Sequence, residues 1–99
     1  MKPIEFHPEA TREAEHAKSY LEPERAGLGV QFADELEQAL DRIKTNPERF
    51  AIERGRMRRC ILTQFSYSIM FAILEDRIWV SAIAHHKRRS NYWRKRKPE

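Results

Sequence analysis

Residues 67–84 read YSIMFAILEDRIWVSAIA, and this stretch decides the fold that the sequence predicts. Apolar side chains alternate along both of its halves, which is the period of a β-strand with a buried face. Glu75-Asp76-Arg77 separates the halves and predicts a tight reversal, so the two strands are expected to be antiparallel neighbours. The predicted faces are Tyr67, Ile69, Phe71 and Ile73 in the first strand, and in the second Ile78, Val80, Ala82 and Ala84 on one side with Trp79 and Ile83 on the other.

Working outward, residues 57–62 predict a further strand before this pair, and residues 2–7 predict a short one at the start of the chain. Two amphipathic helices are expected between them. The first helix begins at Pro8, where a missing N–H costs nothing, and ends at Pro23. The second follows Gly27-Leu28-Gly29 and ends at Asn46-Pro47. We expect residues 48–55 to form a loop and the acidic side chains of the second helix to be solvated.

The element order is therefore β-α-α-β-β-β. Two helices joined by a short Gly-containing link predict an antiparallel hairpin, and this hairpin would cover one face of a small, largely antiparallel sheet. The predicted fold class is α+β with two layers. Its 99 residues suit a single domain, residues 1–99, whose last part, residues 85–99, forms a basic tail.

The charge of the chain is concentrated at its C-terminal end. The net charge is +4 at pH 7, but residues 85–99 hold seven Lys and Arg against one Glu and so carry +6. The other 84 residues therefore carry the difference between +4 and +6, which is −2. A basic tail of this kind attracts polyanions, either nucleic acid or an acidic protein segment.

Composition narrows the class of protein. Hydrophobic residues make up 40% and charged residues 34% of the chain, as in soluble globular proteins. No apolar run approaches the ~20 residues that a membrane helix needs, and the first residues do not form a signal peptide. Cys60 is the only cysteine, which excludes an internal disulfide and favours a reducing compartment. We expect a cytoplasmic protein without a membrane partner.

Several motifs, in order along the chain, resemble those of the RelE/ParE toxins of type II toxin–antitoxin systems, including the plasmid-stabilisation proteins. The ending AHHKRRSNYW, residues 84–93, is the most specific of them, and the resemblance covers nearly the whole chain. The other motifs are Phe6-His7-Pro8-Glu9-Ala10, Gly27-Leu28-Gly29 with the helix after it, Asn46-Pro47, and Arg58-Arg59 leading to Phe65-Ser66-Tyr67-Ser68-Ile69.

The resemblance implies a toxin that needs no cofactor and forms a hetero-oligomer with a cognate antitoxin. The antitoxin would lie on the helical hairpin and the sheet edge, with Leu28, Phe32, Leu36 and Arg59 among its contacts. The family has two branches. RelE-like members cut mRNA on the ribosome, whereas ParE-like members inhibit DNA gyrase and are not known to be enzymes. The residues expected to bind the target are Arg88, Arg89, Tyr92 and Trp93.

Two positions favour the ParE-like branch. RelE-like nucleases place basic side chains where this chain has Cys60 and Ser68, and RNA cleavage without a metal depends on such charges. Inhibition of gyrase without catalysis is therefore the leading hypothesis. The first alternative is a ribosome-dependent endoribonuclease, and the second is a non-toxic module that binds nucleic acid through its basic tail. If the chain is a nuclease, its catalytic residues would be drawn from Arg58, Arg59, His85, Arg88, Arg89 and Tyr92.

The sequence does not assign a role to either residue of the pair His85-His86. Adjacent residues of a strand point to opposite faces, as the arginines 58 and 59 should also do. No cysteine or carboxylate stands near the histidines in sequence, so a metal site is not expected. One histidine should be packed and the other solvated. Tyr92-Trp93 would either stack on bases or dock the tail onto the domain, and docking is favoured.

Overall fold

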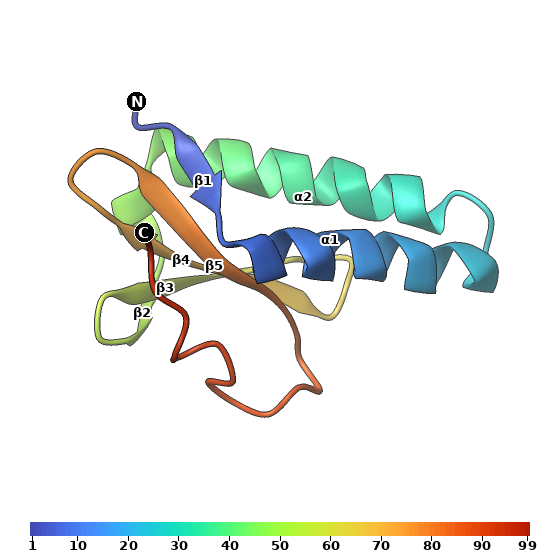
Figure 1. Cartoon of the computed structure of the whole chain (residues 1–99). Helices are drawn as coiled ribbons and strands as arrows, with labels where there is room; N and C mark the ends of the chain where they lie inside the picture. The colour runs from blue at the N-terminus through green and yellow to red at the C-terminus, as the bar shows by residue number, and fades with distance from the viewer.

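Two helices lie side by side across one face of a five-stranded sheet, and the C-terminal tail passes along the other side of the molecule (Figure 1). This arrangement comes from a computed structural model that describes residues 1–99. The sheet order is β1-β5-β4-β3-β2, with β1 parallel to β5 and every other pair antiparallel. The elements are β1 (Ile4–Phe6), α1 (Pro8–Leu21), α2 (Leu28–Thr45), β2 (Ile52–Arg54), β3 (Met57–Ile61), β4 (Tyr67–Ile73) and β5 (Ile78–His85), with single 3₁₀ turns at Glu22–Glu24 and Pro47–Arg49.

The α+β class, the helical hairpin and its boundaries are confirmed. Helix α1 begins at Pro8, and the Nδ1 atom of His7 accepts the N–H of Glu9 at 3.0 Å as an N-terminal cap. Gly27 turns the chain with φ of +91°, a conformation that favours glycine. At Gly29 the two helices approach so closely that an added Cβ would lie 3.0 Å from the carbonyl oxygen of Lys18.

One strand is missing from the sequence prediction. Residues 48–55 were expected to form a loop, whereas the structure contains a 3₁₀ turn followed by β2 at the edge of the sheet. Strand β2 is only three residues long and all of them are exposed. It therefore has no buried side that would produce an alternating pattern in the sequence. It forms a strand because it pairs with β3.

The predicted faces of β5 are wrong beyond Val80. Phe71 pairs with Val80 but Met70 pairs with Ala82, so Ser81 is an extra residue, a β-bulge that reverses the alternation. Ile83 consequently joins the core under the helices, while Ala82 turns to the opposite face. The predicted face of β4 is confirmed, since its side chains all pack into or against that same core.

The sheet is covered on both faces. The main core fills the space between helices and sheet, and it includes Phe32, Ile69 and Phe71. A smaller cluster lies on the other face, where Trp93 of the tail packs with Met70, Ala82 and Ala84. The predicted docking of the tail is therefore confirmed for Trp93, which is only 4% exposed.

The sequence predicted that all the acidic side chains of α2 are solvated, and this is wrong for one of them. Glu35 is buried, and its carboxylate accepts the N–H and the hydroxyl of Thr63 and the N–H of Gln64, at 2.5, 2.8 and 3.0 Å. Burial works to raise the pKa of Glu35, but these hydrogen bonds outweigh it and lower the pKa. Glu35 thus anchors the loop between β3 and β4 to the hairpin.

Candidate functional site

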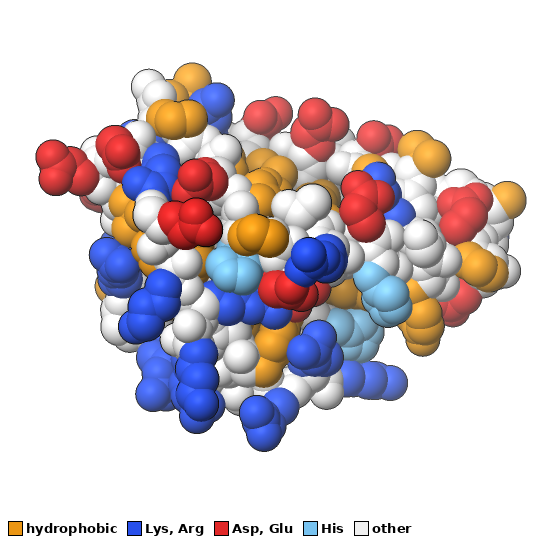
Figure 2. Space-filling model, viewed as in Figure 1, with side chains coloured by type: hydrophobic (Ala, Val, Ile, Leu, Met, Phe, Trp, Pro, Cys, Tyr) orange, Lys and Arg blue, Asp and Glu red, His pale blue; other side chains and the backbone are white.

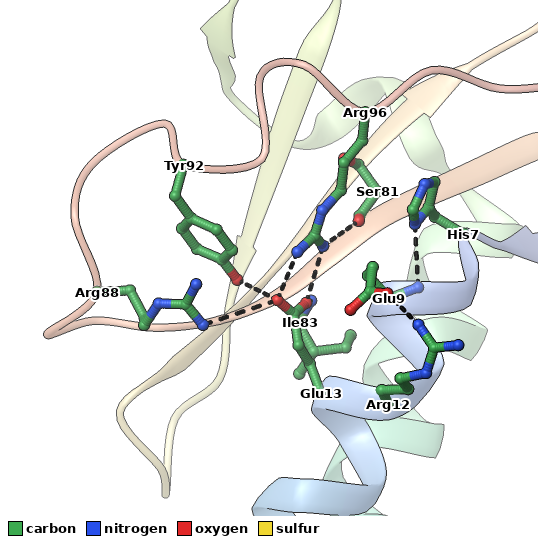
Figure 3. Close-up of polar contacts among 9 residues, drawn as sticks. All are labelled: His7, Glu9, Arg12, Glu13, Ser81, Ile83, Arg88, Tyr92 and Arg96. Atoms are coloured by element: carbon green, nitrogen blue, oxygen red, sulfur yellow. Dashed lines mark hydrogen bonds and ion pairs between the residues drawn. The ribbon is translucent and has the colours of Figure 1, made fainter.

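A carboxylate of α1 holds the C-terminal tail against the domain (Figure 3). Glu13 accepts the Tyr92 hydroxyl at 2.7 Å and the Arg96 guanidinium at 2.9 and 3.1 Å. It also accepts the backbone N–H of Ile83 at 3.0 Å, while Arg96 donates to the carbonyl of Ser81, the bulge residue, at 2.8 Å. Glu13 and Arg96 are only 14% and 15% exposed in their side chains. We call these five residues the tail clasp.

Two cations lie against the ring of Tyr92, Arg96 of the clasp and its neighbour Arg88, which also approaches Glu13 at 3.9 Å. The guanidinium carbon of Arg88 lies 3.9 Å from the ring centre of Tyr92, and that of Arg96 lies 5.1 Å from it. Cations over an aromatic face are attracted by the negative charge of its π-system. Burial and the bond to Glu13 raise the pKa of the Tyr92 hydroxyl far above its ordinary range, so it stays protonated and acts as a donor. The tail is thereby held in one shape.

Glu13 was not among the residues singled out from the sequence. It stands three residues after Ala10 and four before Ala17, both of which are buried, so it lies on the packed stripe of α1. A carboxylate on such a stripe needs a partner, because an unpaired buried charge is costly. The position of Glu13 on this stripe could have indicated a buried ion pair. The sequence does not show that the partner is Arg96, 83 residues later.

A second polar group lies on the sheet face opposite the helices. The Ser68 hydroxyl is within 2.8 Å of Nε2 of His86 and accepts Nε of Arg59 at 3.1 Å. Arg59 also pairs with Glu53 at 3.5 Å. Desolvation lowers the pKa of His86, and the nearby charge of Arg59 lowers it further. This face thus presents a neutral imidazole beside a guanidinium.

The alternation of neighbouring residues is confirmed in both basic pairs. Arg58 points to the helix side, where it donates to the carbonyls of Glu48 and Phe50 at 3.1 and 2.8 Å. His85 lies on the helix side as well, with its ring 4.8 Å from that of Tyr67. Of the residues predicted for a nuclease, the side chains of Arg58 and His85 thus point to the helix side of the sheet and away from Arg59, and His86 takes the place beside it.

The tail carries exposed positive charge. Figure 2 shows Lys and Arg side chains gathered on the lower side of this view, whereas acidic side chains dominate the hairpin above. Arg88 is 54% exposed in its side chain, and Arg89 is exposed too. Trp93 is buried and the Tyr92 hydroxyl is occupied, so of the four residues predicted to bind the target only the two arginines are exposed, and Arg88 also lies 3.9 Å from Glu13.

A groove runs between α1 and α2 on the outer side of the hairpin. It has a volume of about 350 Å³, and Ala14, Ala33, Leu36 and Leu40 contribute its apolar lining. Leu28 is half-buried at the start of α2 and does not line this groove. Phe32, by contrast, is 0% exposed and packs edge-on against Phe65 and Tyr67, so its predicted contact with an antitoxin is wrong.

Comparisons with known proteins agree with this architecture. The family described as "ParE toxin of type II toxin-antitoxin system, parDE" matches residues 4–90. The chain belongs to this ParE toxin family. A solved structure described as the chromosomal ParDE TA system from P. aeruginosa shares the fold, with a TM-score of 0.76 and 11% identity, covering 86% of this chain and 96% of that one. A search of curated protein sequences found no significant match.

The resemblance drawn from the sequence is thereby confirmed, and with it the ParE-like branch. The match ends at residue 90, so the clasp residues Tyr92 and Arg96 lie outside it. Neither helix of this ParE toxin is long and apolar enough to span a membrane. No three side chains of His, Cys, Asp or Glu come together as a metal site would require.

The lowered pKa of His86 makes stability depend on pH. Above its ordinary value of 6.5 the imidazole is neutral in both folded and unfolded chains. As pH falls below that value the unfolded chain takes up the proton first, so stability is lost toward the lower folded pKa. We expect urea unfolding midpoints to fall between pH 7 and about pH 5, and less so in His86→Gln. An unchanged pH dependence in this variant would assign the effect to another group.

Proposed function

We propose that this ParE toxin inhibits DNA gyrase by binding it through the basic tail, and that a cognate antitoxin neutralises it. The observation that carries the proposal is the tail clasp. Two polar residues of the tail, Tyr92 and Arg96, both donate hydrogen bonds to Glu13. They shape a rigid tail and leave Arg88 and Arg89 exposed on it. Such an arrangement suits recognition of an acidic or phosphate-bearing surface.

The chemistry of the neighbouring groups also favours binding over catalysis. A proton donor to a leaving group should have a pKa near the working pH, and the pKa of Tyr92 is raised far from it. A guanidinium such as that of Arg59 does not release its proton at neutral pH. The Ser68 hydroxyl is fully buried and cannot reach a substrate. These residues fit structural roles better than roles in RNA cleavage.

The target-binding role is tested most directly at Arg89. Arg89→Ala should raise the concentration needed to inhibit gyrase supercoiling about tenfold, since a lost charge-assisted hydrogen bond costs on the order of 1.5 kcal/mol. Arg56→Ala is the matched control, because Arg56 is an exposed arginine in the turn between β2 and β3. Equal loss in both variants would indicate a general charge effect. Full inhibition by Arg89→Ala would remove this residue from the interface.

The groove of the hairpin is proposed to receive the antitoxin. It combines small and apolar side chains from both helices, which suits the apolar face of an amphipathic helix. Leu28 and Leu36 remain as proposed contacts of the antitoxin. Arg59 lies on the other face of the sheet, so a segment that contacts both Leu36 and Arg59 must wrap around the domain.

Ala33 is the position at which antitoxin binding can be blocked without opening the core. It is half-buried and lines the groove, so Ala33→Arg should fill the space and weaken antitoxin binding at least about tenfold. Co-purification and calorimetry with the antitoxin encoded beside the toxin would measure this. Gln38→Arg adds the same charge on an exposed position of α2 and should bind normally. Normal binding by both variants would place the antitoxin elsewhere.

One observation supports cleavage of mRNA as a second candidate. His86, with its lowered pKa, is available as a base beside Arg59, and Arg89 lines the same small cavity. A translating extract with purified toxin distinguishes the two functions. Cleaved mRNA that disappears in His86→Gln, with gyrase unaffected, would favour the nuclease over the gyrase inhibitor. Inhibited gyrase with intact mRNA would support the first proposal.

A further inference from the structure

A second groove lies on the side of α1 that faces the tail, away from the hairpin groove. Its volume is about 520 Å³, larger than that of the groove between the helices. Helix α1 forms one wall, the end of β5 and the start of the tail form the other, and the start of β4 closes the floor. The proposed contacts with gyrase and antitoxin leave most of this lining unexplained.

The floor of this groove contains a hydroxyl that has no partner within the chain. Tyr67 is 7% exposed and lines the groove together with Ile83. Its hydroxyl takes part in none of the hydrogen bonds of the structure, and it is not a buried unpaired atom, since Ser81 Oγ is the only one of these, so the hydroxyl is open to the groove. Burial raises the pKa of Tyr67, as do the neighbouring Tyr20 and Glu24, so this hydroxyl is a donor at neutral pH.

The walls of the groove carry aromatic rings. His16 and Tyr20 lie one helical turn apart on α1, with ring centres 6.2 Å apart and planes at 18°. Across the groove the ring of His85 meets that of Tyr67 at 4.8 Å and 84°. Tyr20 is 58% exposed, so one face of its ring is open to the groove. A planar ligand could stack against these faces.

The rim of the groove is cationic. Arg12, Lys87 and Arg88 line it, against the single carboxylate of Glu13. That carboxylate is already neutralised by the buried Arg96 and bonded to the Tyr92 hydroxyl. Arg12 pairs with Glu9 in the free protein, whereas no ion pair of the structure involves Lys87. Arg88 lies 3.9 Å from that carboxylate but is 54% exposed in its side chain, so a negatively charged ligand would find Lys87 and the exposed part of Arg88 at its entrance.

We propose that this groove binds a nucleoside phosphate, either free or as one unit of a single strand. The base would stack on the rings of α1, its polar edge would meet the Tyr67 hydroxyl, and its phosphate would lie at Lys87 and Arg88. Aromatic stacking combined with cations is how proteins hold unpaired bases. An acidic peptide would use the rim as well, but it would leave the flat aromatic walls and the Tyr67 hydroxyl without a complementary group.

Binding by the full chain can be measured with defined probes. Fluorescein-labelled oligouridylate and oligothymidylate would be followed by anisotropy, and AMP and UMP by calorimetry. Tyr20→Ala and Lys87→Ala should each weaken binding about fivefold or more, and neither threatens the fold because both side chains are exposed. Tyr67→Phe removes only the hydroxyl and should weaken binding as well. Lys95→Ala is the control, since Lys95 is an exposed lysine of the same tail outside the groove.

The outcomes separate the sources of the ligand from failure of the proposal. Binding of mononucleotides supports a free nucleotide, and binding of oligonucleotides alone supports a single strand. The proposal is overturned if no probe binds, or if only an acidic peptide such as Glu-Trp-Glu binds. It is also overturned if Lys95→Ala weakens binding as much as Lys87→Ala while Tyr20→Ala has no effect, which would indicate unspecific attraction to the tail. Inhibition of gyrase is a separate readout.

Discussion

Glu13→Ala is expected to lower the free energy of unfolding by about 3–5 kcal/mol, the range for breaking a buried ion pair. The substitution removes the acceptor of Tyr92, Arg96 and the Ile83 N–H at once. Arg96 would keep only the carbonyl of Ser81 while its charge stays mostly buried. Urea unfolding followed by circular dichroism measures the change.

Glu15→Ala is the matched control for Glu13→Ala. It removes a carboxylate from the same helix, but Glu15 is exposed and its bridge to Lys18 at 3.2 Å lies on the surface, so about 0–0.5 kcal/mol is expected. Glu13→Gln should fall between the two, because an amide oxygen can still accept one of the bonds. If Glu13→Ala proves as stable as Glu15→Ala, the clasp contributes nothing and the tail is held by Trp93 alone.

Trp93→Ala is expected to have an effect of similar size, about 3–5 kcal/mol, the range for truncating a buried aromatic side chain. Trp93 covers Met70, Ala82 and Ala84 on the sheet face that has no helix, so its loss exposes this second core. Trp93→Phe should recover part of the lost stability, since it refills most of the space. Thermal unfolding and limited proteolysis after Lys87 or Arg89 would follow release of the tail.

The two tail variants also connect stability with the proposed function. If the tail must be rigid to bind gyrase, then Glu13→Ala and Trp93→Ala should both weaken inhibition, although neither residue lies at the exposed surface. Arg89→Ala should weaken inhibition without destabilising the fold. Destabilised variants that still inhibit gyrase at full strength would show that the target orders the tail on its own.

Much of the fold could be predicted because it depends on local patterns. Three signals depend only on residues that are neighbours in the sequence. They are the alternation in β4, the proline at the start of α1 and the glycine that turns the chain between the helices. The bulge at Ser81 escaped prediction because it depends on the pairing of β5 with β4, and strand β2 escaped because it is short and wholly exposed. Phe32 was assigned to a partner's surface because amphipathic spacing cannot distinguish a core from an interface.

The sequence by itself determined the class of fold, the family and the concentration of charge in the tail, since composition, periodicity and ordered motifs are written along the chain. Only the tertiary structure decided how that tail is held and which of its residues are exposed. It placed Glu13 against Arg96, turned the rings of His85 and His86 to opposite sides of the sheet, and buried Trp93 while leaving Arg88 and Arg89 exposed. The partner of a buried charge depends on how distant segments pack together, and the spacing of residues in the sequence does not predict that packing.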